Sequence, residues 1–288
     1  MTNAAGDAPP GPPAAGPGLG TGEVVETAGP DLDVELLAAG RLTASFAGGV
    51  LTVTLAAPEV RNAQLPDTWK ALAHIGSRVS PAVRVVVLRG AGRSFSAGLD
   101  RSAFAGGPDS PLALIGRAPR DVGDLQIAGY QAGFAWLSDP SFVSIAAVQG
   151  HAVGAGFQLA LACDLILAAD DARFTMAEVG LGLVPDLGGT GRLVRAVGTA
   201  RALEICATGR RVDAAEAVRI GLAAAAVPAA DLDAAVGDLC AALLAPAPET
   251  VRAITRLIAG AVDRSTAGRL AAERAEQIDR IRALFVGG

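Results

Sequence analysis

Four short segments of the chain have the hydrophobic pattern of β-strands. Residues 51–55 alternate leucine or valine with threonine, which is the period of a strand with one buried face. Residues 84–90, 144–150 and 165–169 are instead almost continuously apolar at their centres. Such runs are typical of strands that are covered on both faces. The pattern predicts a sheet with a buried centre.

Helical patterns lie between and after these strands. They cover residues 66–79, 112–138 and 155–163, so strands and helices alternate along the chain. This alternation is typical of an α/β fold. The end of the chain is almost entirely helical in pattern, over residues 251–262 and 265–284.

The N-terminal segment has a different composition from the rest. Of its first 30 residues, 19 are Ala, Gly or Pro, and no hydrophobic period is visible. Such composition is typical of disorder. We therefore expect a disordered leader over residues 1–33, a core over 34–225 and a helical C-terminal region over 226–288.

The composition of the 288 residues narrows the possible functions. The net charge is −5 and only 4% of the residues are aromatic. A nucleic-acid-binding protein needs positive charge for phosphates and aromatic rings for unstacked bases. We therefore expect no nucleic-acid partner.

Cysteine and histidine usage predicts a reducing compartment and no metal site. The three cysteines are an odd number and lie far apart in apolar sequence, at positions 163, 206 and 240. Reduced, buried thiols fit this pattern, and we expect a cytoplasmic protein. The two histidines, His74 and His151, lie near no CxxC motif, so the usual soft ligands form no metal cluster.

One segment is long enough to raise the question of a membrane span. Residues 140–163 carry no formal charge. The run nevertheless contains Gln149, His151, Gln158 and several glycines. A buried strand, a glycine turn and a buried helix fit it better, so we expect no membrane association.

Glycines concentrate after the predicted strands, where backbone can approach a ligand closely. The dinucleotide motif GxGxxG and the phosphate-loop motif GK[ST] do not occur. Two turns, Ala97-Gly98-Leu99-Asp100 and Gly154-Ala155-Gly156-Phe157, can instead expose backbone N–H groups. Two such donors aimed at one point would form an oxyanion hole. Tight turns and close helix packing would explain the same glycines.

Two carboxylates lie in apolar, glycine-rich sequence, Glu178 and Asp186. An acid among aliphatic side chains is desolvated, which favours its neutral form and suits general acid and base catalysis. The alternative interpretations are an exposed loop charge for Glu178 and a helix N-cap for Asp186.

Four segments, in order and spacing, resemble the crotonase (enoyl-CoA hydratase/isomerase) superfamily. They are Pro58-Glu-Val-Arg-Asn62-Ala63, Phe95-Ser-Ala-Gly-Leu-Asp100, the stretch from Gln149 to Asp164, and the stretch from Phe174 to Leu193 with its Gly-Gly-Thr190. The resemblance covers about residues 41–284. It implies a spiral of ββα turns, a helical C-terminal region used in trimer contacts, and a homotrimer or hexamer.

The resemblance also implies an acyl-CoA thioester substrate, with coenzyme A part of the substrate and no separate cofactor. By position, the N–H groups of Leu99 and Ala155 would hold the thioester oxygen. The residues implied to contact the substrate or its CoA are Arg61, Asn62, Ala63, Ala97, Gly98, Leu99, Asp100, Gly154 and Gln158.

The catalytic positions leave several reactions open. Hydratases of this superfamily use two glutamates; Glu178 matches the second, but Gln158 stands at the first. A single glutamate resembles the enoyl-CoA isomerases, and Asp186 matches an aspartate found in other members. We favour isomerase-type proton transfer by Glu178 and Asp186. A hydratase in which Gln158 holds the water and a non-catalytic acyl-CoA binding protein are the alternatives.

Overall fold

The computed structural model of the chain describes residues 29–103 and 107–285. The strands are β1 (Leu42–Ala47), β2 (Val50–Leu55), β3 (Val85–Gly90), β4 (Val143–Val148), β5 (His151–Val153), β6 (Leu165–Ala169), β7 (Arg173–Thr175), β8 (Arg211–Asp213) and β9 (Ala225–Val227). The α-helices are α1 (Val34–Ala39), α2 (Pro66–Arg78), α3 (Pro111–Arg117), α4 (Arg120–Ala135), α5 (Ala155–Ala162), α6 (Gly189–Val197), α7 (Thr199–Thr208), α8 (Ala214–Arg219), α9 (Leu232–Leu244), α10 (Pro248–Ala259) and α11 (Thr266–Phe285). Most of the predicted leader, residues 1–28, lies outside the described residues.

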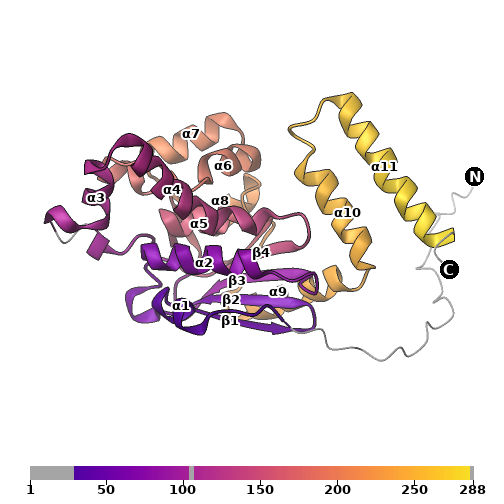
Figure 1. Cartoon of the computed structure of the whole chain (residues 1–288), viewed down its shortest axis with the longest axis horizontal. Coiled ribbons are helices and arrows are strands. Elements are labelled where there is room, and N and C mark those ends of the chain that lie inside the picture. The colour runs from indigo at the N-terminus through magenta and orange to yellow at the C-terminus, as the bar shows by residue number, and fades with distance from the viewer. Residues whose placement is uncertain (1–28, 104–106, 286–288) are drawn as a thin grey trace, which may run out of the picture.

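Two sheets organise the molecule (Figure 1). The larger has the order β1-β2-β3-β4-β6-β9, and the smaller has the order β5-β7-β8. In the larger sheet only β1 and β2 pair antiparallel; all later pairs are parallel. The four predicted strands are confirmed as β2, β3, β4 and β6. The α/β class predicted from the alternation is confirmed as well.

The central strands are buried on both faces, as their apolar runs predict. Val86 and Leu88 of β3 belong to the main core, together with the buried face of α2. Val85 and Val87 point to the other face, where they pack in a second cluster with Leu232 and other residues of α9. Because successive side chains of a strand point to opposite faces, a continuously apolar run needs a cover on each side.

The helical pattern over residues 112–138 forms two helices rather than one. α3 ends at Arg117 and α4 begins at Arg120, with Ala118 in an extended conformation between them. Pro119 causes the break, because its ring disfavours helical dihedrals in the residue before it. The prediction of helical structure is confirmed, but the segment is not one continuous helix.

The uncharged run of residues 140–163 folds as the strand, turn and helix that its glycines predict. It contains β4, β5 and α5, and all eight residues of α5 are buried. Within residues 29–103 and 107–285, no helix combines the length and the apolar character that a membrane crossing requires.

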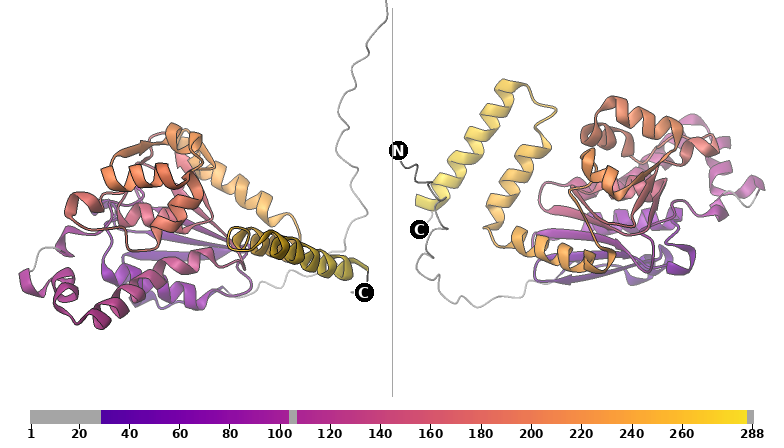
Figure 2. Two further views of the ribbon diagram at one scale, coloured as in Figure 1. Left: turned by 90° about the horizontal axis from the view of Figure 1, so that it is seen from above. Right: turned by 180° about the vertical axis from the view of Figure 1, so that it is seen from behind.

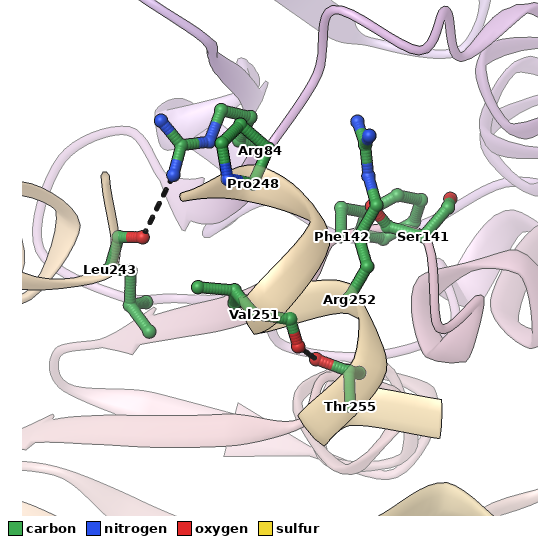
Figure 3. A pocket seen from close by; sticks show the side chains of 8 residues that line it. All are labelled: Arg84, Ser141, Phe142, Leu243, Pro248, Val251, Arg252 and Thr255. Atoms are coloured by element: carbon green, nitrogen blue, oxygen red, sulfur yellow. Dashed lines mark hydrogen bonds between the residues drawn. The ribbon is translucent and has the colours of Figure 1, made fainter. Parts of the chain in front are cut away.

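The last two helices form an arm that extends away from the sheets (Figures 1 and 2). None of the described residues of α11 is buried, and Arg256 of α10 binds Glu276 of α11 through two hydrogen bonds of 2.7 and 2.8 Å. At the base of the arm, Arg84 donates to Pro246 O, and Arg252 donates to Ser141 O. Figure 3 shows these arginines beside a cavity of about 10 Å³, roughly the space of a single water molecule.

Candidate active site

The first predicted donor turn, residues 97–100, lies beside the segment that precedes α2. The N–H of Gln64 donates to Gly98 O at 2.8 Å, and the N–H of Asp100 donates to Gln64 O at 2.8 Å. In this parallel bridge the N–H of Leu99 points away from Gln64. No hydrogen bond between the described residues uses it. Leu99 therefore offers a backbone donor to a ligand.

Buried polar side chains hold this turn. Ser96 Oγ accepts from Gln64 Nε2 at 3.0 Å and from Gly98 N–H at 3.2 Å, and it donates to Asn62 O at 2.8 Å. Gln64 Oε1 in turn accepts from Trp69 Nε1 at 2.7 Å. Gln64 and Ser96 are fully buried. The sequence analysis missed both roles, because the partners lie up to 34 positions apart and form no motif.

Arg61 and Asn62, two of the residues implied to contact the substrate or its CoA, lie next to the first donor turn. Arg61 and Asn62 both adopt left-handed conformations, with φ of 53° and 54°. The buried Asn62 side chain accepts from Ala57 N–H and donates to Ala91 O and Ser94 O, so it braces the turn. Arg61 is exposed, and its carbonyl accepts from Ala97 N–H.

Asp100 closes the first turn with an ion pair. Its carboxylate binds Arg41 Nη1 at 2.7 Å, and the same guanidinium donates to Ala63 O. The pKa of Asp100 is lowered, first by the Ser102 N–H that donates to it and then by Arg41. Asp100 thus remains ionised and joins the segment at Ala63 to the donor turn.

The second predicted donor turn lies between β5 and α5. Gly154 has φ 51° and ψ −119°, a region open in practice only to glycine. It directs the first N–H of α5, that of Ala155, out of the helix, where an N-terminal N–H has no internal partner. None of the hydrogen bonds between described residues uses the Ala155 N–H.

The two donor turns lie against each other. A Cβ atom at Gly98 would overlap Val153 O and would lie 3.5 Å from the Ala155 nitrogen. The donor residue Leu99 directly follows Gly98, so both free N–H groups belong to one small region. This closeness supports the predicted oxyanion hole over the simpler interpretation of glycines used only for packing.

Glu178 lies beside Gly154. It begins the short 3-10 helix η5 (Glu178–Leu181) and is only 9% exposed, so the interpretation as an exposed loop charge is wrong. A Cβ at Gly154 would lie 3.4 Å from Glu178 Oε1, which places the carboxylate beside the second donor turn. Glu178 Oε2 is buried and has no hydrogen-bond partner among the described residues.

Burial raises the pKa of Glu178, because a charge in an apolar region lacks solvation. Its own backbone N–H and Gln158 partly oppose this shift, whereas the charge of Asp186 adds to it. The two carboxylates therefore lie close enough for their charges to interact. Burial likewise raises the pKa of Asp186, although the residue keeps contact with solvent.

Asp186 is not the helix N-cap that was the alternative interpretation. α6 begins at Gly189 and its N-cap is Gly188 in a left-handed conformation. The carbonyl of Asp186 accepts from Gln131 Nε2 of α4 at 2.7 Å. The Asp186 side chain is exposed and caps no helix, and the sequence analysis missed Gln131.

Gln158 is buried on α5 and uses both ends of its amide. Nε2 donates to Glu178 Oε1 at 2.7 Å. Oε1 accepts from Leu187 N–H at 2.9 Å and from Gly189 N–H at 3.3 Å. The geometry places Gln158 behind Glu178, as a support for the carboxylate and for the loop that carries Asp186.

Two free N–H groups and a carboxylate with an unpaired oxygen can perform a specific kind of chemistry. The donors would stabilise negative charge that develops on a carbonyl oxygen, and the carboxylate would move a proton at a neighbouring carbon. The enoyl-CoA hydratase/isomerase family profile matches residues 45–282 of this chain.

Individual relatives agree with this family. A carnitinyl-CoA dehydratase of Proteus mirabilis is 37% identical over 213 residues, which cover 73% of this chain and 77% of the relative. A protein of Mycobacterium tuberculosis, named as a probable enoyl-CoA hydratase, is 35% identical over 182 residues. That match covers 62% of this chain and 66% of the relative, just under two thirds of its length.

Solved structures match over more of the chain. A protein of Thermobifida fusca YX, described as an enoyl-CoA hydratase in complex with CoA, is 45% identical with a TM-score of 0.81, covering 88% of this chain and 97% of that one. Its complex with acetoacetyl-CoA has a TM-score of 0.82 at 45% identity, with 86% and 98% covered. This chain has the crotonase fold and belongs to the enoyl-CoA hydratase/isomerase family.

Proposed function

We propose that the protein isomerises the double bond of an enoyl-CoA thioester, with Glu178 as the base. The observation that carries the proposal is the carboxylate of Glu178 beside the second donor turn, whose buried Oε2 has no hydrogen-bond partner among the described residues. A buried oxygen left unpaired costs stability, so a site that keeps one is suited to receive a proton from a substrate.

The proposed reaction needs no cofactor, because the thioester carbonyl itself activates the neighbouring carbon. The Leu99 and Ala155 N–H groups bind the thioester oxygen, and Glu178 Oε2 takes a proton from C2 of a 3-enoyl-CoA. The electrons of that C–H bond form an enolate conjugated with the double bond, and the N–H groups stabilise its oxygen. A proton then adds at C4, so the double bond moves to C2–C3 and no atom is gained or lost.

Asp186 supports this scheme as the second proton carrier. Its charge raises the pKa of Glu178, and its own pKa is raised by burial. A carboxyl that has taken up a proton can donate it to C4. We propose that Glu178 works at C2 and Asp186 at C4.

Hydration of a 2-enoyl-CoA is the second candidate, and the names of the relatives favour it. The contacts of Gln158 favour the isomerase. Its amide oxygen already accepts two backbone N–H groups and its Nε2 already donates to Glu178, so one N–H remains to hold a water.

The decisive experiment follows the conjugated-thioester absorbance with 3-enoyl-CoA and, separately, with 2-enoyl-CoA esters. The proposal expects a rise with the former. It expects Glu178→Gln to lose about 10²- to 10⁴-fold in kcat while CoA-ester binding is retained. Glu35→Gln, an exposed glutamate on α1, is the control and should keep full activity.

The other outcomes are equally clear. A fall of absorbance with 2-enoyl-CoA and silence with 3-enoyl-CoA would make the protein a hydratase. Tight binding of the esters without turnover of either would make it an acyl-CoA binding protein. Full activity of Glu178→Gln would exclude Glu178 as the base.

We further propose that the chain assembles as a homotrimer, or as a hexamer of two trimers, through its helical arm. Ile258 and Val262 are 69% and 67% exposed in the single chain, and Ile254 and Leu270 are about half exposed. Apolar surface of this extent on α10 and α11 favours burial against another subunit. Light scattering of the purified protein measures the assembly directly.

A further inference from the structure

Two glutamines form hydrogen bonds with the same peptide unit, the one between Asp186 and Leu187. The carbonyl of Asp186 accepts from Gln131 Nε2 at 2.7 Å, and the N–H of Leu187 donates to Gln158 Oε1 at 2.9 Å. This carbonyl and this N–H belong to one planar peptide group, which is hydrogen-bonded to α4 through the first glutamine and to α5 through the second. The backbone that carries Asp186 is thereby fixed in both position and orientation.

The amide of Gln158 can have only one orientation. The N–H groups of Leu187 and Gly189 are donors, so the side-chain atom that faces them must be the oxygen. The NH₂ group then faces Glu178 and donates to Oε1 at 2.7 Å. Gly189 makes the approach possible, because a Cβ there would lie 2.7 Å from Gln158 Cγ.

One consequence concerns the two oxygens of Glu178. Oε1 is occupied by Gln158, whereas Oε2 has no partner among the described residues. A donor on Oε1 also favours the ionised carboxylate, which is the form that a base needs. The amide thus leaves Oε2 as the free atom and partly opposes the effect of burial on the ionised form.

We propose that Gln158 is the positioning residue of this site, joining the Glu178 carboxylate to the Asp186 loop so that Glu178 Oε2 is the atom that exchanges the proton. Gln131 of α4 holds the other end of the same peptide, so it positions Asp186 but not Glu178. We call these two glutamine contacts the clamp. The inference rests on the proposed function, since it assigns roles within that same proton transfer.

The test compares the pH dependence of kcat for 3-enoyl-CoA isomerisation between variants. Gln158→Glu replaces the donor with a carboxylate at hydrogen-bond distance from Glu178. Like charge disfavours ionisation, so the acidic limb should move to higher pH by more than about one unit. Gln277→Glu, the same change at an exposed position of α11, should leave the limb in place. An unchanged limb and kcat in Gln158→Glu would overturn the proposal.

Gln131→Leu separates the two halves of the clamp. It releases the Asp186 carbonyl and leaves the Gln158 contact with Glu178 intact. We expect kcat to fall several-fold while the acidic limb of Glu178 stays at its wild-type pH. A shift of the limb as large as that of Gln158→Glu would contradict the division of roles.

An infrared titration separates failure of this inference from failure of the proposed function. The carboxyl band that disappears in Glu178→Gln identifies Glu178 without any substrate. Its titration midpoint should move to higher pH in Gln158→Leu, because the N–H donor to Oε1 is lost. If the midpoint shifts but the protein does not isomerise 3-enoyl-CoA, the role of Gln158 is supported and the proposed reaction is wrong. If the midpoint does not shift, the role proposed for Gln158 is wrong.

Discussion

The donor turns and the helical arm solve opposite problems within one chain. Around the donor turns the side chains of Gln64, Ser96 and Asn62 are buried and paired. The N–H groups of Leu99 and Ala155, by contrast, make no hydrogen bond among the described residues. The arm has no buried residue in α11 and attaches to the core through arginine contacts with backbone carbonyls. The polar groups of the first region are paired within this chain, whereas the second region exposes apolar side chains such as Ile258.

This difference shows where precision is needed. Oxyanion stabilisation depends on donors fixed to within a fraction of an ångström, and only dense local bonding provides that. An interface gains its free energy from buried apolar area and tolerates looser attachment of each helix. Substitutions in the two regions should therefore produce different kinds of loss.

Among substitutions in the donor turns, the largest loss should come from Gly154→Ala. The φ of 51° and ψ of −119° are strained for alanine, whose Cβ would also lie in contact with Glu178 Oε1 at 3.4 Å. The turn must shift, and the Ala155 N–H shifts with it. We expect kcat to fall about 10²- to 10³-fold, the effect of losing one oxyanion donor.

Steady-state kinetics measure this effect, and Gly237→Ala is its control. Gly237 lies within α9 in open space, where alanine favours the helix by about 1 kcal/mol. Wild-type kcat in Gly154→Ala would mean that the second donor turn plays no part in catalysis.

The next effect is on stability. Ser96→Ala removes the hydroxyl that accepts from Gln64 and Gly98 and donates to Asn62 O. Buried groups that lose a partner cost about 1–3 kcal/mol, so the free energy of unfolding should fall by that amount. Urea denaturation at fixed protein concentration measures it. A loss below about 0.5 kcal/mol, the usual range for a surface substitution, would show that the network is dispensable.

The sequence predicts the elements better than it predicts these supports. The strands at 84–90 and 144–150 follow from local apolar runs, because a buried strand carries its signal within its own residues. The break at Pro119 also had a local signal, the steric effect of proline on Ala118, which the reading of one long helical pattern passed over.

The site divides in the same way. The two donor turns could be predicted from glycines and from the family resemblance, because a special backbone conformation leaves a trace in the residue type. The roles of Gln64, Gln131 and the Gln158 oxygen could not, since their partners lie 29 to 55 positions away and exist only in the folded chain. Such long-range bonds have no periodicity to detect.

The arm should respond in assembly rather than in folding. Ile258→Asp places a charge on an exposed apolar position of α10. If that face is covered by another subunit, the charge is desolvated without a partner and association weakens by several kcal/mol. Sedimentation should show smaller species, whereas the unfolding of the single chain should change by less than about 0.5 kcal/mol. An unaltered mass would place the interface elsewhere.

The smallest effect concerns the free energy of unfolding, which is lowered when the buried Glu178 carboxylate ionises. The pKa of Glu178 is raised above its ordinary value of 4.5 by burial, so the folded chain binds this proton more tightly than the unfolded chain does. Stability therefore falls as the pH rises from 4.5 through the folded pKa, and the loss is complete above it.

Glu178→Gln cannot ionise and escapes this loss. The variant should gain stability relative to the wild type between pH 4, where both side chains are neutral, and pH 8, where only Glu178 is ionised. Urea denaturation at the two pH values measures it; an advantage that grows toward pH 4 would mean that the folded protein favours the ionised carboxylate, against the burial seen here.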